Sequence, residues 1–146
     1  LRDTSLPALR RGAERAGRDP AGLDVSVGVF VVTGRDDAER REVARATRAQ
    51  IAFYASTPPY RPVLEAHGWA DLQAEFQTLA RAGRWSEMGD LIDDTMLDTF
   101  AVVVGTPEEA GPAIAKRFAG LATRAYLYGT WLPDEDTQRA VRDAIR

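Results

Sequence analysis

The sequence predicts a helix-rich α/β fold whose few parallel strands form part of a larger sheet or barrel. Two apolar runs carry this prediction, at residues 25–33 (VSVGVFVVT) and residues 124–128 (RAYLY). The first run shows no polar alternation, and we interpret both runs as parallel strands that helices cover on both faces. Two strands alone leave backbone hydrogen-bonding groups unpaired, so the pattern indicates that further strands complete the sheet.

The first expected element is a helix over residues 6–17. Leu6, Leu9 and Ala13 recur at helical spacing, and Gly17 is suited to end the helix. The strand at residues 25–33 follows. A turn at residues 34–37 then leads into a helix over about residues 37–54, with Asp36 or Asp37 as its N-cap.

Prolines and glycines divide the rest of the chain. Pro58 and Pro59 must break the second helix. Apolar spacing then predicts helices over residues 60–67, 70–82, 85–100 and 106–119, and a terminal helix that starts at Asp134. The short apolar run at residues 101–104 is consistent with either a helix or a strand. The second strand, at residues 124–128, precedes the terminal helix.

Composition narrows the class of protein. The 146 residues are 45% hydrophobic and 28% charged, which is typical of a globular domain, and they include no cysteine for disulfide or thiolate chemistry. A net charge of −3 favours neither a nucleic-acid nor an anionic membrane partner. No apolar run approaches the roughly 20 residues that span a bilayer, so we expect a cytoplasmic protein. The chain begins with Leu1 instead of methionine, which favours a piece of a longer protein.

Three ordered stretches resemble one family. They are residues 6–34, residues 50–69 (QIAFYASTPPYRPVLEAHGW) and residues 79–110 (LARAGRWSEMGDLIDDTMLDTFAVVVGTPEEA). Together they resemble the C-terminal region of the luciferase-like monooxygenase superfamily, and within it the deazaflavin-dependent oxidoreductases. The ordered series is more specific than any piece, because helix capping alone produces GTPEE.

The resemblance implies that residues 1–146 are one C-terminal segment of a TIM-like β/α barrel of eight strands. Residues 25–33 would be the seventh strand and residues 124–128 the eighth, with a late helical insertion at about residues 37–100. The parent enzyme would bind a deazaflavin coenzyme or FMN and transfer a hydride to or from a small organic substrate, or oxygenate that substrate. The earlier strands of the family supply most cofactor contacts, so we expect this chain alone to be inactive and to lack the main cofactor site.

On that fold, the active site lies at the carboxyl ends of the strands. Thr33 and Gly34 follow the first strand, and Trp131 follows the second. We therefore expect Thr33 and Gly34 to approach the cofactor and Trp131 to contact the substrate. The alternative for Gly34 is a glycine that the turn requires.

A polar and aromatic cluster surrounds the proline break. We expect it to close over a substrate ring, with aromatic stacking and an arginine that holds an anion. The alternative is that the tyrosines pack and the prolines only end a helix. The cluster comprises Tyr54, Ser56, Thr57, Tyr60 and Arg61.

His67 is the single histidine. It is a candidate catalytic residue that could supply a proton or orient a substrate, or else a helix-end residue before Gly68. No second histidine or acidic pair lies at ligand spacing, so we expect no metal. The rival to the enzyme hypothesis is a non-catalytic helical module without a cofactor site, which pairs or exchanges strands with a second copy.

Overall fold

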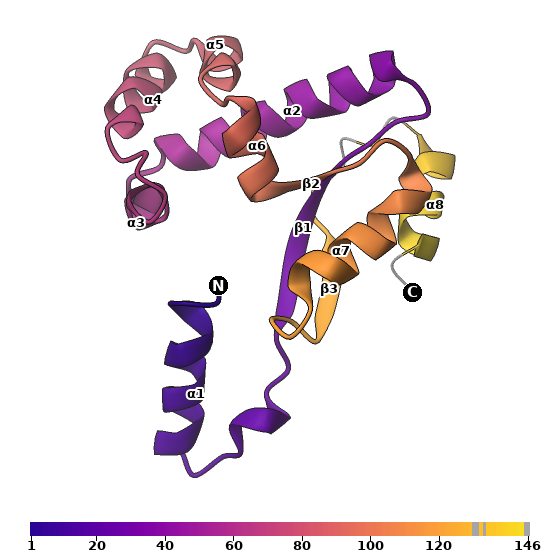
Figure 1. The fold of residues 1–146 in the computed structure, drawn as a ribbon. Coiled ribbons are helices and arrows are strands. Elements are labelled where there is room, and N and C mark those ends of the chain that lie inside the picture. The colour runs from indigo at the N-terminus through magenta and orange to yellow at the C-terminus, as the bar shows by residue number, and fades with distance from the viewer. Residues whose placement is uncertain (130–131, 133, 145–146) are drawn as a thin grey trace.

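A three-stranded parallel sheet lies at the centre of the computed structural model, which describes residues 1–129, 132 and 134–144 (Figure 1). The register pairs Phe30 with Ala101 on one side of the central strand and Ser26 with Arg124 on the other. Within the described residues the sheet is open, and no closed barrel forms. The strands, in the spatial order β2-β1-β3, are β1 (Ser26–Val32), β2 (Ala101–Val103) and β3 (Arg124–Leu127).

The strands answer one open question and correct two of the predictions. The undecided run at residues 101–104 forms β2, so the described sheet has three strands, and those at residues 25–33 and 124–128 cannot be consecutive. The prediction that both long runs are buried on both faces is also wrong. β3 alternates between exposed and half-buried residues, and β1 is well buried only from Val29 onward. The physical reason is that β3 is an edge strand, while β2 pairs only with the second half of β1.

Helix α2 (Asp37–Ser56) follows β1 and is the longest described element. Its N-cap is Asp36, whose carboxylate accepts hydrogen bonds from the backbone N–H groups of Ala38 and Glu39, both at 2.8 Å. Hydrogen bonding from the Glu39 N–H is the main cause that lowers the pKa of Asp36. This confirms the predicted helix and its cap, and Thr57 leaves the helix in extended conformation just before the two prolines.

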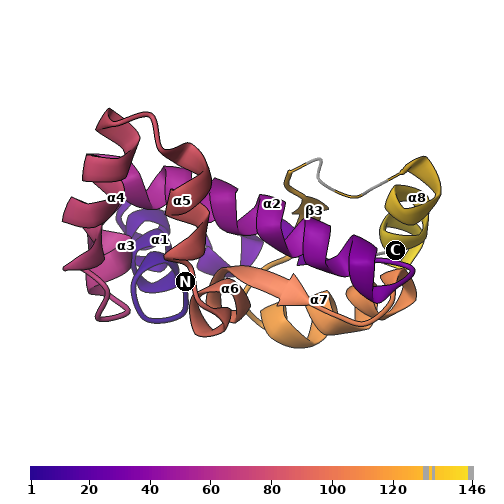
Figure 2. The same ribbon diagram turned by 90° about the horizontal axis from the view of Figure 1, so that it is seen from above.

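Four helices gather at the far end of α2, on one side of the strands, while α7 and α8 lie on the other side (Figures 1 and 2). A short 3₁₀ turn (Pro58–Tyr60) leads into the first helix of the group, which is shorter than predicted. The four are α3 (Arg61–Glu65), α4 (Leu72–Arg81), α5 (Trp85–Asp90) and α6 (Asp94–Phe100).

The predicted single helix over residues 85–100 is wrong, because the chain breaks between α5 and α6. Asp93 caps α6 by accepting a hydrogen bond from the Met96 N–H at 2.7 Å. Arg48 of α2 donates to the Ile92 carbonyl and pairs with Asp94. The break therefore satisfies its polar groups locally and presents Ile92 to the core, where its side chain is buried.

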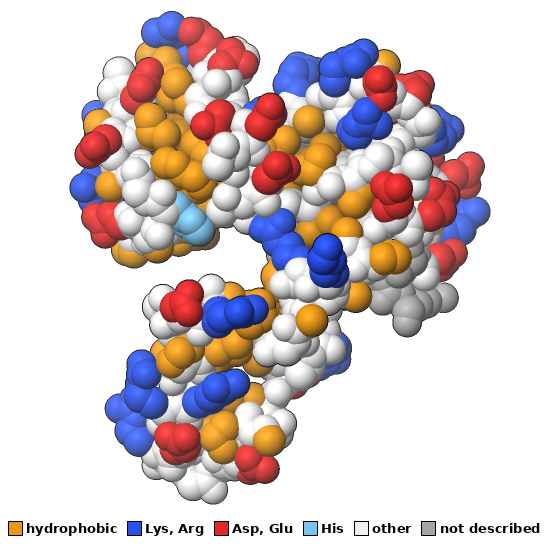
Figure 3. All heavy atoms as spheres, in the orientation of Figure 1, with side chains coloured by type: hydrophobic (Ala, Val, Ile, Leu, Met, Phe, Trp, Pro, Cys, Tyr) orange, Lys and Arg blue, Asp and Glu red, His pale blue; other side chains and the backbone are white. Residues whose placement is uncertain are grey.

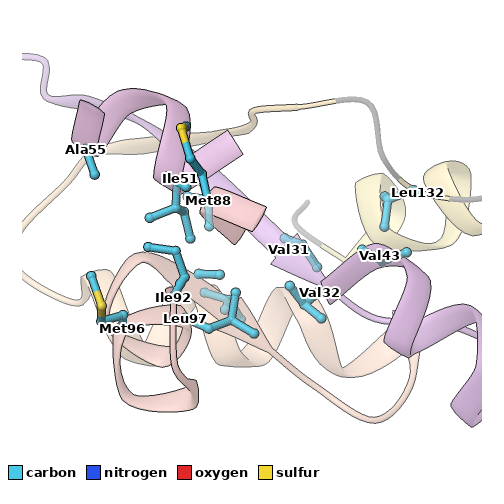
Figure 4. Packing of buried hydrophobic residues seen from close by; sticks show 14 of the residues in the cluster. Val31, Val32, Val43, Ile51, Ala55, Met88, Ile92, Met96, Leu97 and Leu132 are labelled. Atoms are coloured by element: carbon cyan, nitrogen blue, oxygen red, sulfur yellow. The ribbon is translucent and has the colours of Figure 1, made fainter. Parts of the chain in front are cut away.

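One continuous core joins the sheet to the helices. Val31 and Val32 of β1 pack beneath α2, and Met88, Ile92 and Met96 fill the space toward the helical group (Figure 4). Among the described residues, Phe76 of α4 is the largest side chain that is fully buried. The core fixes the far end of α2 relative to β1, and this placement creates the site described below.

The remaining helices flank the body. Helix α7 (Ala110–Phe118) follows a 3₁₀ turn (Pro107–Glu109) and packs with α8 (Glu135–Ala144). Helix α1 (Ser5–Arg15) and the turn at Pro20–Gly22 form an arm apart from the body, with basic side chains along it (Figures 1 and 3). In the part of the chain that the structure describes, no helix is both long and apolar enough to cross a membrane.

Candidate functional site

A cleft of about 420 Å³ lies between the sheet and the far end of α2. One wall is formed by Gly28 and by aromatic side chains of β1, of β3 and of the residue after β3. Residues of α2, the 3₁₀ turn, α3 and the end of α6 complete the lining. Its size falls in the range of roughly 300–1,000 Å³ that is usual for small-molecule sites. The lining residues are Gly28, Phe30, Ile51, Tyr54, Ala55, Tyr60, Val63, Leu64, Phe100, Tyr126 and Tyr128.

Aromatic rings around the cleft hold one another in position. Tyr128 meets Phe30 edge to face, with ring centroids 5.4 Å apart. Tyr54 meets Tyr60 in the same manner, also at 5.4 Å. Such contacts stabilise a pair by about 0.5–1.5 kcal/mol beyond the area they bury. The cleft walls are therefore formed by mutually braced rings, and Tyr60 and Tyr128, each 44% exposed, remain open to solvent.

The two walls meet through a pair of tyrosine hydroxyls. The hydroxyl oxygens of Tyr54 on α2 and Tyr128 after β3 lie 2.6 Å apart, and either can be the donor. The hydrogen bond with Tyr54 raises the pKa of Tyr128. The phenol of Tyr128 therefore stays protonated at neutral pH and remains available as a hydrogen-bond donor or acceptor.

The structure brings two of the five residues of the predicted polar and aromatic cluster into the cleft, Tyr54 and Tyr60. The other three serve local structure. The hydroxyls of Ser56 and Thr57 both donate to the Phe53 carbonyl at the end of α2. Arg61 donates from Nε to Glu65 at 2.8 Å within α3. The predicted role of these three in substrate binding stays a prediction.

Thr33 and Gly34 follow β1, away from the cleft lining. Thr33 is fully buried, and its hydroxyl has no hydrogen-bond partner among the described residues. A Cβ atom at Gly34 would lie 2.6 Å from the Arg40 backbone nitrogen and 2.8 Å from the Glu39 Cβ. The turn onto α2 accounts for Gly34 without a cofactor, so the expected cofactor contacts of both residues stay predictions.

His67 lies outside the cleft lining, at the surface beyond α3. Its ring stacks on Trp69 with centroids 5.1 Å apart and meets Phe100, which lines the cleft, edge to face at 5.6 Å. The packing accounts for the position of His67, and its catalytic role stays a prediction. Trp131, the remaining predicted substrate contact, lies outside the described residues.

Sequence reasoning missed the sheet wall of the cleft. Gly28 and Phe30 are two residues apart on β1, and Tyr126 and Tyr128 are two apart along β3 and its end. Residues at i and i+2 of a strand share a face. That spacing was the available signal, and it would have placed both tyrosines on one face of the sheet.

Charge is absent from the described cleft lining, which carries only apolar side chains and tyrosine hydroxyls. Among the residues that the structure describes, no group of three or more His, Cys, Asp or Glu side chains could hold a metal ion. The arrangement can therefore hold an uncharged ring and exchange hydrogen bonds with it, whereas a carboxylate or phosphate would find no countercharge.

Comparison with known proteins gives a consistent result. A family model described as luciferase-like monooxygenase matches residues 3–125. Uncharacterized proteins of Mycobacterium bovis and Mycobacterium tuberculosis are each 51% identical over 124 residues, which is 85% of this chain and 36% of the relative. A 5,10-methylenetetrahydromethanopterin reductase of Methanolobus tindarius is 29% identical over 110 residues, 73% of this chain and 32% of that protein. The chain thus spans about a third of the length of these curated relatives.

Proposed function

The chain belongs to the luciferase-like monooxygenase family, and from this membership we propose that it is the substrate-side portion of a flavin- or deazaflavin-dependent oxidoreductase. The complete protein would transfer a hydride to or from a small organic substrate, or oxygenate it. The observation that carries the proposal is the family match over residues 3–125. The aromatic cleft supports it, since ring walls of this kind suit planar substrates. Within a complete β/α barrel, the described strands would join the remaining strands of the protein.

The described lining residues suit the planar ring of a coenzyme or substrate, but they do not suit the phosphate groups of a coenzyme. Tyr54, Tyr60 and Tyr128 could hold a planar ring, but no lysine or arginine is among the described lining residues to meet a phosphate. The coenzyme, when bound, would supply or accept the hydride. We therefore assign the anionic part of the coenzyme to the rest of the complete protein, consistent with an inactive isolated chain.

The role we assign to this chain is to orient the substrate and exclude water from it. Tyr54 and Tyr128 fix the polar edge of a bound ring through their hydroxyl pair. Phe30 and Tyr60 provide apolar faces that keep water from the ring. Positioning of this kind accelerates a transfer step because it removes the entropy cost of alignment.

Hydride transfer with a deazaflavin is the form of the reaction that we favour. The stretches at residues 50–69 and 79–110 resemble the deazaflavin subgroup, and the relative from Methanolobus tindarius is named as a reductase. Neither observation concerns a residue that contacts a coenzyme, so FMN and oxygenation are tested alongside.

The test uses the complete protein from the native gene and the 146-residue chain side by side. Each is titrated into the oxidised deazaflavin coenzyme and into FMN, and coenzyme fluorescence is recorded. We expect the complete protein to bind one coenzyme with a saturable change and the chain alone to bind neither. Binding of neither coenzyme by the complete protein would overturn the proposed function. Tight binding by the chain would overturn our assignment of the main cofactor site to the rest of the protein.

A non-catalytic, self-associating module is the alternative, and the open sheet favours it. The outer edges of β2 and β3 carry no strand partner among the described residues, and such edges can pair with another copy. Sedimentation of the 146-residue chain over a range of concentrations tests it. A concentration-dependent dimer, together with no coenzyme binding by the complete protein, would favour the module over the enzyme.

A further inference from the structure

Four tyrosines line the cleft among apolar side chains, and the hydroxyls of two of them, Tyr54 and Tyr128, are paired by a hydrogen bond. The two phenol groups carry one hydroxyl hydrogen each, and the hydrogen bond between them uses one of these two hydrogens. The second hydrogen has no acceptor in the part of the chain that the structure describes. A hydroxyl that already accepts a hydrogen bond is also a stronger donor, because hydrogen bonds in a chain polarise one another.

Ring contacts on both sides keep this pair in place. Phe30 braces Tyr128 from β1, and Tyr60 braces Tyr54 from the 3₁₀ turn. The two hydroxyls therefore come from elements that the core fixes independently. A donor held in this way loses little conformational entropy when it binds an acceptor, and it can discriminate between ligands that differ only in that acceptor.

The sheet wall of the cleft includes a glycine beside a tyrosine ring. Gly28 of β1 pairs with Tyr126 of β3, and a Cβ atom at Gly28 would lie 3.1 Å from the Tyr126 ring and hydroxyl. The outer end of the tyrosine ring therefore lies close to the glycine. A larger residue at Gly28 would itself occupy space at the cleft and would force the Tyr126 ring to shift.

Charge on a ligand would be unfavourable here. The nearest arginine along the lining segment, Arg61, is held by Glu65. A carboxylate or sulfonate placed among the described lining residues would find no cation with which to form an ion pair.

We infer that this cleft selects an uncharged planar ring that bears a carbonyl or similar acceptor, and that the Tyr54–Tyr128 hydroxyl pair recognises that acceptor. The inference rests on the proposed function only in treating the ligand as the organic substrate of the oxidoreductase. Tyr54 and Tyr128 are thereby specificity-determining residues. The substrate class is a neutral ring ketone, aldehyde or amide, in contrast to a carboxylate or a plain hydrocarbon.

The experiment measures ring binding to the 146-residue chain without any coenzyme. Prodan, an uncharged naphthyl ketone whose fluorescence reports an apolar environment, serves as the probe. Three naphthalenes of similar size then compete with it: acetylnaphthalene has a neutral acceptor, naphthoate is anionic, and ethylnaphthalene has no acceptor. We expect acetylnaphthalene to bind about tenfold more tightly than naphthoate. It should also bind about three- to tenfold more tightly than ethylnaphthalene, as one hydrogen bond allows.

Three variants assign this preference to its residues. Changing both Tyr54 and Tyr128 to phenylalanine should leave ethylnaphthalene binding unchanged and remove the preference for the ketone. Tyr126→Phe removes another hydroxyl of the cleft lining, one that lies outside the pair, and the preference for the ketone should persist because the pair carries it. Gly28→Leu should weaken all three ligands together. Circular dichroism checks that each variant is folded. If the double variant is not folded, Tyr54→Phe alone is measured in its place.

Several results would overturn the inference. They are equal or tighter binding of naphthoate, loss of the ketone preference in Tyr126→Phe, and unchanged binding in Gly28→Leu. Failure of the proposed function can be told apart from failure of this inference. In that case the complete protein binds no coenzyme, but the 146-residue chain still prefers the neutral ketone.

Discussion

Gly34→Ala should destabilise the chain in the absence of any cofactor. The new Cβ would lie 2.6 Å from the Arg40 nitrogen and 2.8 Å from the Glu39 Cβ. Non-bonded carbon atoms ordinarily approach to about 3.5–4.0 Å, so the first turn of α2 would have to move by about 1 Å. Gly34 is buried, and overpacking at such a site costs about 1–3 kcal/mol.

Thermal unfolding followed by circular dichroism measures this effect. At about 2–4 °C per kcal/mol for a chain of this size, Tm should fall by roughly 2–12 °C. Gly12→Ala is the control, because a Cβ there meets nothing within 4 Å and alanine favours the helix. Its Tm should stay the same or rise slightly. An unchanged Tm in Gly34→Ala, with weaker coenzyme binding by the complete protein, would refute the packing argument and favour the role of Gly34 beside a cofactor.

Three further predictions concern the frame of the cleft. Phe76→Ala, at the largest fully buried side chain of the described core, should lower the free energy of unfolding in urea by about 3–5 kcal/mol, and a loss under 1 kcal/mol would contradict that packing. Arg48→Met should cost about 1–3 kcal/mol, because it leaves the Ile92 carbonyl at the α5–α6 break without its donor; unchanged urea unfolding would show that the break does not depend on it. The pKa of Asp36 is lowered by folding, so its contribution is full above the unfolded-state value of about 3.9 and is lost as pH falls through the lower folded value. Between pH 6 and pH 2.5, Asp36→Asn should therefore show a smaller loss of Tm than the unmodified chain, and parallel curves would contradict this assignment.

Local signals predicted the elements well where they acted alone. Asp36 and the pair Pro58 and Pro59 bound α2 as expected, since capping and the missing proline N–H act within a few residues. The break at Ile92 was missed because apolar spacing continues across it. The donor that satisfies it, Arg48, is 44 residues away in the chain. Such a contact leaves no local mark in the sequence.

The candidate site was predicted in part for the same reason. Tyr54 and Tyr60 stood out because they flank the proline break, and both line the cleft. Gly28 and Tyr128 joined them only through strand pairing, which places β3 beside β1 although β2 lies between them in the chain. A sequence pattern assigns residues to a face of a strand but does not show which strands are neighbours.

The most direct test of the central claim is a crystal structure of the complete protein with its coenzyme and acetylnaphthalene. The account predicts that the naphthalene ring lies between the walls formed by Tyr60 and Tyr128. Its carbonyl oxygen should accept a hydrogen bond from the Tyr54–Tyr128 pair, and the coenzyme ring should face the open side. A cleft filled by side chains from the rest of the protein, with the ligand bound elsewhere, would contradict the account.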